Sequence, residues 1–528
     1  MNGAQALIRT LASCGIEVCF TNPGTSEMHF VAALDTVPEM RGILGLFEGV
    51  VTGAADGYGR MAGKPAATLL HLGSGLGNGV ANLHNARRAF TPIVNIVGDH
   101  ATYHNQYDPP LASDINSIAK GVSSWIRSSA SPALIAEDAA DAVRAAIGPP
   151  GQVATLILPA DVSWSEGAEP AKPRSGGSAT ILNTDVIEEV AKVLATSRSA
   201  ALLLGGAALR KVPLAAAELI SKATGAKVLC ETFPTRLERG AGIASVERLG
   251  YLAEFMALQL DGVEDLVLIG AKAPVSFFAY PGKESYLVPE GCTVHTLATC
   301  ADDVAAAVSG LADCVGSSIS GSGLESSEAN SASGTAITDL GSPQGELSAE
   351  LFAHAVAAVL PEGAIISDES NTSGLFLAGA TANCPAHDIL TLTGGAIGQG
   401  MPVATGAAVA CPDRPVLSLE SDGSAMYTAQ SLWTQSRENL NVTTVILNNG
   451  SYAVLNMELN RVGAEPPGPK AKKMLDITGP SIDFVALGQS MGVPGIRVDR
   501  AEDLVKALNR AIEEPGPHLI EAMVPSII

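Results

Sequence analysis

Two segments near the C-terminus place oxygen ligands at the ends of neighbouring predicted strands. Residues 420–424 read Glu-Ser-Asp-Gly-Ser, and residues 448–452 read Asn-Asn-Gly-Ser-Tyr after an apolar run. Asp422 offers a carboxylate, Asn449 an amide oxygen and Ser451 a main-chain carbonyl. Such hard oxygen ligands suit Mg²⁺ and leave coordination positions for phosphate oxygens and a water molecule.

The alternative interpretation of these segments is two ordinary turns, because Ser, Asp, Asn and Gly are all favoured in turns. Either segment alone fits that interpretation. Their joint occurrence across one strand–helix–strand unit favours a magnesium site. Gly423 and Gly450 would let the main chain approach a ligand closely.

A single carboxylate, Glu48, stands inside the apolar run of residues 45–51 in the N-terminal region. A carboxyl group in such surroundings is desolvated and can share a proton with a basic ring nitrogen. The alternative is a glutamate that begins a helix at the surface of a domain. The sequence alone leaves both interpretations open.

Three histidines follow predicted strands in the same region. His71 follows the strand over residues 67–70 and precedes the glycine-rich stretch 73–79, which we interpret as a loop that allows close backbone approach. As a dinucleotide fingerprint the stretch is weak, since no acidic ribose partner stands at the expected distance. His100 and His104 follow the next predicted strand. A lone histidine is more often structural, but three in strand-end loops are candidates for proton transfer.

Short apolar runs bounded by Gly, Pro or Asp alternate with helical patterns along the chain. This alternation predicts parallel β-α-β units with ligand-binding loops at the carboxyl ends of the strands. We therefore predict an α/β fold of three Rossmann-like, doubly wound parallel-sheet domains. The clearest predicted strands cover residues 93–97, 154–158, 201–204, 266–269, 364–366, 416–419, 443–447 and 519–523.

Two changes in composition divide the chain. Residues 163–178 are rich in Pro, Gly, Glu and Ser and predict a linker, and residues 316–342 contain too few apolar side chains to pack a core. The predicted organisation is a first domain over 1–165, a central domain over 180–315, a Ser/Gly-rich linker over 316–342 and a third domain over 343–528.

The chain of 528 residues carries 54 acidic and 32 basic side chains, a formal net charge of −22. Because this acidity repels phosphate backbones and anionic lipid surfaces, we expect neither nucleic acid nor a membrane as a partner. The eight cysteines contain no CxxC pair, which argues against a zinc site and fits a reducing compartment. No secretory segment and no apolar stretch of about 18 residues is found, so we expect a soluble, cytoplasmic protein.

Five motifs together resemble one family, the thiamine-diphosphate-dependent 2-oxo-acid enzymes, which include acetolactate synthase, benzoylformate decarboxylase and pyruvate decarboxylase. The resemblance covers nearly the whole chain, and the motifs fall in the family's order and spacing. They are residues 22–27, Glu48 with residues 54–60, residues 71–79, residues 394–402 and the pair Asp422 and Asn449. No single motif is decisive, but the set is specific.

The resemblance implies a role for each matched residue. Glu48 takes the position of the cofactor-activating glutamate, and His71 and Thr25 those of an active-site histidine and serine of benzoylformate decarboxylase. His100 and His104 are further candidates for proton handling. Asn371, Thr372, Gly423 and Ser424 would bind the diphosphate region, and Ile397 would be the bulky residue that folds the cofactor into a V shape. The magnesium ligands fall on Asp422, Asn449 and the carbonyl of Ser451.

Some positions depart from the family's patterns. Ser421 stands where glycine is usual and puts a side chain beside the metal loop. The adjacent histidine pair of pyruvate decarboxylase is missing, since His100 and His104 are four positions apart. Residues 273–280 carry aromatic side chains where benzoylformate decarboxylase has its second active-site histidine, and Leu455 replaces a carboxylate of pyruvate decarboxylase.

These observations predict a thiamine-diphosphate- and Mg²⁺-dependent lyase or carboligase that acts on a small 2-oxo acid. The acetolactate-synthase-like reaction, carbon–carbon bond formation after decarboxylation, is the leading hypothesis. One alternative is a benzoylformate-type decarboxylase that releases an aldehyde. Another is a non-catalytic cofactor-binding subunit, which Ser421 alone favours and the retention of Glu48 opposes.

The resemblance also implies an assembly. In the family the cofactor lies between the first domain of one subunit and the third domain of another, so we expect at least a homodimer, commonly a homotetramer. The central domain binds a flavin or adenine nucleotide in some relatives. Here Gly205, Gly206 and Gly270 at strand ends are a weak signal, and a flavin is the minority expectation.

Overall fold

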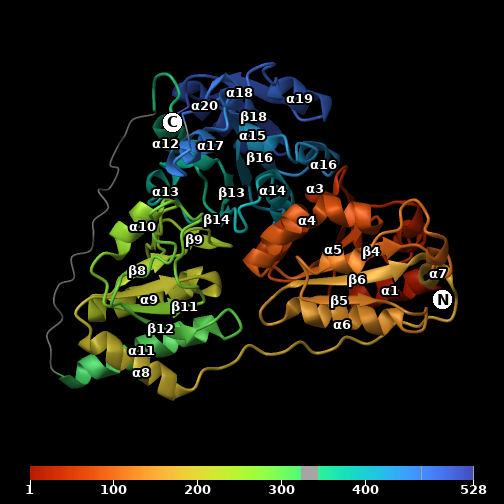
Figure 1. Ribbon diagram of the computed structural model, residues 1–528, viewed down its shortest axis with the longest axis horizontal. Coiled ribbons are helices and arrows are strands. Elements are labelled where there is room, and N and C mark those ends of the chain that lie inside the picture. The colour runs from red at the N-terminus through yellow and green to blue at the C-terminus, as the bar shows by residue number, and fades with distance from the viewer. Residues whose placement is uncertain (323–342, 465, 527–528) are drawn as a thin grey trace.

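The computed structural model describes residues 1–322, 343–464 and 466–526, and it contains three α/β units (Figure 1). Each unit is built on its own sheet, with helices on both faces. The strand pairs inside the three sheets are parallel except for one edge strand. The predicted fold class is confirmed, and a strand is found at each of the eight clearest predicted positions.

The first sheet has six strands in the order β2-β1-β3-β4-β6-β5. This order places the carboxyl ends of β1, β3 and β4 next to one another. The strands are β1 (Val18–Asn22), β2 (Arg41–Leu44), β3 (Ala66–Leu70), β4 (Ile93–Asp99), β5 (Trp125–Ser128) and β6 (Val153–Pro159). The helices are α1 (Gly3–Ser13), η1 (Thr25–Glu27), α2 (Met28–Leu34), α3 (Glu48–Ala62), α4 (Leu72–Ala89), η2 (Asn105–Tyr107), α5 (Ile115–Ala119), α6 (Ile135–Ile147) and α7 (Ala160–Trp164).

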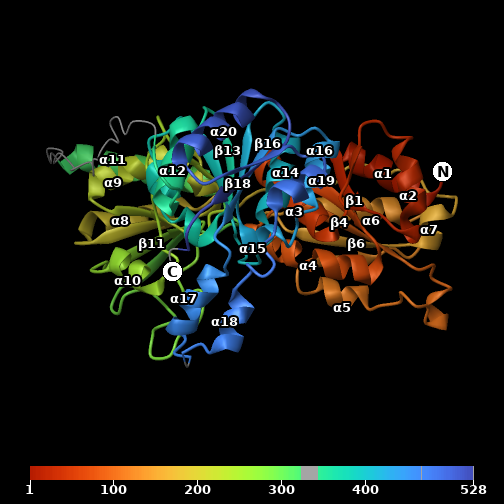
Figure 2. The same ribbon diagram turned by 90° about the horizontal axis from the view of Figure 1, so that it is seen from above.

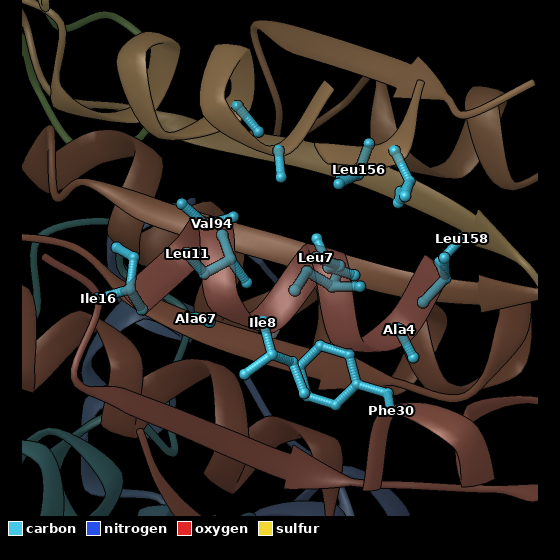
Figure 3. Close-up of a cluster of buried hydrophobic side chains, with 14 of the residues drawn as sticks. Ala4, Leu7, Ile8, Leu11, Ile16, Phe30, Ala67, Val94, Leu156 and Leu158 are labelled. Atoms are coloured by element: carbon cyan, nitrogen blue, oxygen red, sulfur yellow. The ribbon is translucent and has the colours of Figure 1, made fainter. Parts of the chain in front are cut away.

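Helix α1 shows how the chain builds one face of this sheet. Asn2 caps the helix, because its side chain accepts a hydrogen bond from the Gln5 amide at 2.9 Å. Leu7 and Leu11, four positions apart, then lie on one side of the helix. Figure 3 shows these side chains packed against Val94 and other core residues of the sheet.

The central sheet has five strands in the order β10-β8-β7-β11-β12. The strands are β7 (Ala200–Leu204), β8 (Lys227–Cys230), β10 (Glu247–Arg248), β11 (Asp265–Ile269) and β12 (Thr293–Ala298). The helices are α8 (Thr184–Thr196), η3 (Gly206–Leu209), α9 (Lys211–Thr224), α10 (Ala253–Leu260) and α11 (Val304–Ser322). Helix α11 extends to Ser322 and so includes the first residues of the segment predicted as a linker, 316–342. Residues 323–342 of that segment lie outside the described residues.

The third sheet has seven strands in the order β17-β18-β16-β15-β13-β14-β9. The strands are β9 (Leu237–Arg239), β13 (Ile365–Glu369), β14 (His387–Thr391), β15 (Val416–Ser421), β16 (Val442–Asn448), β17 (Gly495–Val498) and β18 (His518–Met523). The helices are α12 (Ala349–Val359), η4 (Asn371–Gly374), α13 (Leu377–Ala380), α14 (Gly400–Ala410), α15 (Asp422–Ala425), α16 (Ser431–Arg437), α17 (Ala453–Arg461), α18 (Pro469–Leu475), α19 (Phe484–Ser490) and α20 (Ala501–Glu513). Strand β9 pairs antiparallel with β14 and comes from the stretch predicted as the central domain, which ties the two units together.

Helices α3 and α14 join the first unit to the third and lie side by side (Figure 2). Glycines make this crossing close. A Cβ atom on Gly406 would lie 1.8 Å from the main-chain oxygen of Ala54, and one on Gly57 would lie 2.0 Å from that of Val403. Only residues without a side chain fit there, because the two backbones are nearly in contact.

The interpretation of residues 73–79 as a loop is wrong, because they form the first turns of helix α4. The glycines serve close packing instead. A Cβ atom on Gly79 would lie 2.8 Å from Cγ2 of Thr52 in α3, and one on Gly75 would lie 3.0 Å from Oε1 of Glu48. Gly75 and Gly79 are four positions apart, so the helical period places both on the same side of α4, toward α3.

No helix within the described ranges is long and apolar enough to cross a membrane.

Candidate active site

The carboxyl ends of β1 and β3 bring Thr25, Glu27 and His71 together. Thr25 and Glu27 form the short helix η1 after β1, and His71 directly follows β3. Nδ1 of His71 lies 2.8 Å from Oε2 of Glu27, and that oxygen also accepts a hydrogen bond from the Gly24 amide at 2.7 Å. A Cβ atom on Gly24 would lie 2.3 Å from the His71 ring, so the ring packs directly against the main chain next to Thr25.

Glu27 is completely buried, whereas Thr25 is exposed. Burial raises the pKa of the Glu27 carboxyl group above its ordinary value, although its hydrogen bonds and the His71 ring oppose the shift. Oε1 of Glu27 has no hydrogen-bond partner among the described residues. A buried carboxyl group beside an imidazole can hold or transfer a proton.

Glu48 is the first residue of helix α3 and is buried, with 8% of its surface exposed. Both interpretations of its position therefore apply, since it begins a helix and is also removed from solvent. Its Oε2 accepts a hydrogen bond from Nδ2 of Asn78 at 3.0 Å. A Cβ atom on Gly75 would lie 3.0 Å from Oε1 of Glu48 and 3.5 Å from Cβ of His71, so these two side chains lie close together at the start of α4.

His100 and His104 lie beyond β4, the strand beside β3, and their ring centroids are 5.5 Å apart. Nε2 of His100 is buried without a partner among the described residues, whereas His104 is exposed. Gly98, two positions before His100, borders Glu27: a Cβ atom there would lie 1.6 Å from Oε1 of that residue. The structure thus gathers the predicted histidines along one edge of the first sheet.

The third sheet places Asp422 and Asn449 after β15 and β16, which are neighbours. Oδ2 of Asp422 accepts hydrogen bonds from the amides of Asn449 at 3.0 Å and of Gly450 at 2.7 Å, and Oδ1 accepts one from Gly423. Burial raises the pKa of Asp422, and these three amides oppose the shift. The carboxyl group thereby fixes the turn that contains Asn449 and Ser451.

The donor set at this turn fits a hard divalent cation. Asp422 is 1% exposed, and Oδ1 of Asn449 accepts the Ser451 amide at 2.9 Å. Oδ1 of Asp422 and Oδ1 of Asn449 each accept one main-chain hydrogen bond, so each keeps a lone pair for a ligand. No group of three or more His, Cys, Asp or Glu side chains within the described residues is arranged to hold a metal. The predicted set uses one carboxylate, one amide oxygen and one carbonyl, a mixture that suits Mg²⁺ when other oxygens complete the shell.

Asn371, which follows the end of β13, contacts the turn of residues 421–424. It adopts a left-handed backbone conformation with φ of 49°, and its Nδ2 donates to Oγ of Ser421 at 2.9 Å and to Oγ of Ser424 at 3.2 Å. The Ser421 hydroxyl also donates to the main-chain oxygen of Glu369 at 3.2 Å. The serine that departs from the family pattern is therefore accommodated and holds Asn371 in place.

Gly423 and Thr372 complete this edge of the sheet. A Cβ atom on Gly423 would lie 2.5 Å from the Tyr452 ring, so the glycine permits that ring to cover the turn. Thr372 lies within η4 and is half-buried. Amide, hydroxyl and main-chain donors gathered at one sheet edge are suited to bind phosphate oxygens.

The segment that contains Ile397 follows β14 and is hydrogen-bonded to Glu369. Oε1 of Glu369 accepts the Gly398 amide at 2.7 Å and Oε2 accepts the Gly400 amide. Glu369 faces Glu420 across the pair β13–β15, and both carboxyl groups are almost completely buried. Burial raises the pKa of Glu369 to about 7 and that of Glu420 well above its ordinary value.

Aromatic side chains from the central unit cover the glycines before Ile397. A Cβ atom on Gly395 would lie 2.5 Å from the Phe277 ring. Phe277 packs against Tyr251 and Phe278 with ring centroids 5.3 and 4.9 Å apart. The Tyr251 hydroxyl lies 3.2 Å from Oε1 of Glu458 in α17. Residues 273–280, where an active-site histidine is missing, therefore do border the candidate site.

Sequence reasoning missed Glu27, Asn78 and Glu369. Glu369 is the last residue of β13 and Glu27 lies in the short helix η1 that follows β1, so a carboxylate after the carboxyl end of a strand was the available signal. Asn78 gave no signal, because only the packing of α4 against α3 brings it to Glu48. The roles of the predicted site residues stay predictions.

Family models and known proteins match this chain. The family model "Thiamine pyrophosphate enzyme, N-terminal TPP binding domain" matches residues 1–119, and the corresponding C-terminal TPP binding domain model matches residues 376–522. The chain is 58% identical, over the full length of both chains, to a Mycobacterium tuberculosis H37Rv protein named "Putative acetolactate synthase large subunit IlvX". It is 29% identical to benzoylformate decarboxylase of Pseudomonas aeruginosa over 97% of both chains.

Solved structures give the same result. The thiamine diphosphate-dependent 4-hydroxybenzoylformate decarboxylase of Rhodococcus jostii RHA1 superimposes with a TM-score of 0.84 at 25% identity, covering 99% of both chains. Benzoylformate decarboxylase of Polynucleobacter necessarius, at 21% identity and a TM-score of 0.83, has the same fold over 100% of this chain and 99% of its own. With its two TPP binding domains and a full-length relative at 58% identity, the chain belongs to the thiamine pyrophosphate (thiamine diphosphate) enzyme family.

Proposed function

We propose that the protein is a thiamine-diphosphate- and Mg²⁺-dependent lyase or carboligase that decarboxylates a small 2-oxo acid and joins the product to a second carbonyl compound. The observation that supports it most is the pairing, in one chain, of a buried Glu48 beside His71 with the Asp422–Asn449 turn. When bound, the cofactor supplies the electron sink for loss of CO₂. A non-catalytic protein has no need of the buried proton-handling groups.

In this proposal the first unit handles protons. Glu48 holds a proton at the aminopyrimidine ring of the cofactor, and Asn78 keeps its carboxyl group oriented. His71, oriented by Glu27, donates a proton to the substrate or accepts one from it. The exposed Thr25 lies beside His71. His100 and His104 are further proton carriers along the same sheet edge.

The third unit holds the diphosphate and the metal. Asp422, Asn449 and the Ser451 carbonyl would bind Mg²⁺, and Asn371, Thr372, Gly423 and Ser424 would bind phosphate oxygens. Ile397 would support the cofactor from the segment that Glu369 anchors. The central unit has a spacer role in this proposal. A flavin in the central unit stays the minority expectation, because Gly205, Gly206 and Gly270 at strand ends are a weak signal.

A benzoylformate-type decarboxylase that releases an aldehyde is the second candidate. The observation that favours it is the aromatic cluster of Tyr251, Phe277 and Phe278 beside Gly395, because aromatic side chains form apolar, flat walls that suit an aryl substrate. The names of the relatives support both candidates.

We propose that the active unit is at least a homodimer and is commonly a homotetramer. The contacts of Glu48 lie in the first unit and those of Asp422 in the third. Apolar side chains next to the predicted cofactor residues are exposed in the single chain, which is typical of a subunit interface. These side chains are Leu375, Phe376, Met426, Tyr427 and Leu455.

A substrate panel with the cofactor-loaded protein tests the proposed function. Aliphatic and aromatic 2-oxo acids would be assayed for CO₂ release, aldehyde release and ligated product. We expect ligated product from a small aliphatic acid, with activity lost on treatment with EDTA and restored by Mg²⁺. Aldehyde from aromatic acids alone would favour the second candidate. A protein that binds the cofactor but consumes none of the panel would refute catalysis.

The Glu48→Gln variant tests the assignment of Glu48. We expect it to bind thiamine diphosphate but to lose exchange of the thiazolium C2 proton, measured by NMR. Glu39→Gln, which changes an exposed carboxylate of the same unit, is the matched control and should exchange normally. Undiminished exchange in Glu48→Gln would overturn the assignment.

A further inference from the structure

Side chains of helix α4 in the first unit form hydrogen bonds with the main chain around Ile397 in the third unit. Nδ2 of Asn85 donates to the Ala396 carbonyl at 2.8 Å, and Oδ1 of Asn85 accepts the Ala396 amide at 3.2 Å. One side chain thus engages both main-chain groups of a single residue, in the way a neighbouring strand would. Nε2 of His84 lies 3.1 Å from the Gly394 carbonyl, and Nδ2 of Asn82 lies 3.2 Å from that of Gly398.

The contact between α4 and residues 394–398 is close and buried. Asn85 is completely buried, and its Nδ2 also donates to Oδ1 of Asn82 at 3.0 Å. The Thr393 hydroxyl donates to the Asn85 carbonyl at 2.9 Å. A Cβ atom on Gly394 would lie 2.4 Å from Oδ1 of Asn85, so only glycine permits this approach. Buried polar groups with all their partners in place fix a unique geometry.

Glu369 of the third unit binds the same segment by accepting hydrogen bonds from the Gly398 and Gly400 amides. Residues 394–400 are therefore bound by two different units of one chain. Ile397 lies between the Asn85 contact at Ala396 and the Glu369 contact at Gly398. Contacts at the residues before and after it therefore fix the backbone position of Ile397. Asn85 makes the contact that comes from the first unit.

We propose that Asn85 is a positioning residue that holds Ile397 of its own chain in the shape that receives thiamine diphosphate. This inference rests on the proposed function only in naming the ligand. The first unit then serves two sites in a dimer. It supplies Glu48 to the cofactor bound by the partner, and it shapes through Asn85 the cofactor site of its own chain.

The first test measures cofactor affinity and local opening in full-length protein. Asn85→Ala should weaken thiamine diphosphate binding in the presence of Mg²⁺ by about tenfold to hundredfold, because two hydrogen bonds to Ala396 are lost. Amide hydrogen exchange over residues 394–400 should accelerate in the cofactor-free protein. Asn85→Asp keeps the side-chain volume and an acceptor but loses the donor. It should also weaken cofactor binding and accelerate this exchange, and it serves as the test if the alanine variant folds poorly.

Asn95→Ala is the matched control. Asn95 is also completely buried in the first unit, but its hydrogen bonds run to Thr68 and Thr155 of the same sheet. Its replacement should lower the melting temperature while leaving cofactor affinity and exchange over residues 394–400 unchanged. Unchanged affinity in both Asn85 variants, or an equal loss in Asn95→Ala, would overturn the proposal.

The second test separates action within one chain from action across the interface. Two differently tagged chains, one carrying Asn85→Ala and one carrying Glu48→Gln, are co-expressed and the mixed dimer is purified. One site then receives both changes and the other receives none, so we expect about half the activity of the unmodified dimer. If the mixed dimer is no more active than the Asn85→Ala and Glu48→Gln homodimers, Asn85 does not act on the site of its own chain, and the proposal is overturned. Full activity of the Glu48→Gln homodimer would instead refute the proposed function of Glu48, while the affinity test of Asn85 still holds.

Discussion

Nδ1 of His71 lies 2.8 Å from Oε2 of Glu27, and this carboxyl group has no exposed surface. The two residues are 44 positions apart in the chain and meet because β1 and β3 are neighbours in the sheet. A carboxyl group on one ring nitrogen fixes the tautomer and the orientation of an imidazole. In the proposed function, the other ring nitrogen of His71 transfers the proton.

Replacement of this carboxyl group should slow turnover more than it weakens binding. We expect Glu27→Gln to lower kcat by about tenfold to hundredfold, because general acid–base groups depend on their protonation state and orientation. Thiamine diphosphate affinity should stay within about twofold, since Glu27 lies away from the predicted diphosphate and metal ligands. Steady-state kinetics and a cofactor titration measure both. A loss of affinity without a loss of kcat would contradict the assignment.

The buried ion pair of Arg60 and Asp56 should be important for stability. Both side chains are 0% exposed, and Nη2 of Arg60 lies 2.6 Å from Oδ2 of Asp56. Arg60 also donates to the Thr391 carbonyl, which links α3 to β14. Arg60→Met leaves a buried carboxylate unpaired and should reduce the free energy of unfolding by about 3 to 5 kcal/mol, measured by urea denaturation.

The control for this prediction is an exposed pair with the same spacing. Lys222 and Glu218 are also four positions apart on a helix, but their side chains are 58% and 47% exposed. Lys222→Met should change the free energy of unfolding by about 0.5 kcal/mol or less. Equal effects of the two methionine variants would show that burial does not decide the strength of these pairs.

Glycine is required where α3 crosses α14. Gly406→Ala would place a methyl group 1.8 Å from the Ala54 oxygen, so we expect the two units to separate or the protein to be recovered mainly as aggregate. Gly77→Ala changes a helical glycine with no atom within 4 Å of the added group and should be neutral or stabilising by about 0.5 to 1 kcal/mol. Solubility and thermal unfolding compare the two. A well-folded Gly406→Ala protein would contradict the close crossing.

Ser421 should contribute to cofactor binding despite its departure from the family pattern. Ser421→Gly removes the acceptor for Asn371 and the donor to the Glu369 carbonyl. We expect thiamine diphosphate affinity to fall about threefold to tenfold, the effect of losing one or two hydrogen bonds. Calorimetric titration in Mg²⁺ measures it. Equal or tighter binding by the glycine variant would show that the hydroxyl is dispensable.

The buried carboxyl group of Glu369 should make stability depend on pH. Its pKa is raised from 4.5 to about 7, so the folded state holds a proton that the unfolded state releases between these values. Stability from this group is complete below about pH 4.5 and is lost as pH rises through 7, an effect of about 3 kcal/mol. Glu369→Gln cannot ionise, so relative to the natural protein it should be more stable at pH 8 than at pH 5. Urea unfolding of cofactor-free protein at several pH values tests this, and a pH-independent difference would contradict it.

The sequence by itself determined the local elements. Short apolar runs bounded by Gly, Pro or Asp predicted eight strands correctly, since a strand buried on both faces requires a continuous apolar run. The order of the motifs also identified the family, and it located the turn of Asp422 and Asn449 at neighbouring strand ends. These features depend on short stretches of chain, which the residue pattern describes directly.

Only the tertiary structure decided what depends on contacts between distant segments. The glycines of residues 73–79 predicted a loop but lie in helix α4, where Gly75 and Gly79 leave room for Glu48 and Thr52 of helix α3. Strand β9 joins the third sheet, although its neighbours in sequence belong to the central one. The contacts Glu27–His71 and Asn85–Ala396 join residues 44 and 311 positions apart. No local pattern encodes such pairs, because packing in three dimensions determines which buried polar groups find partners.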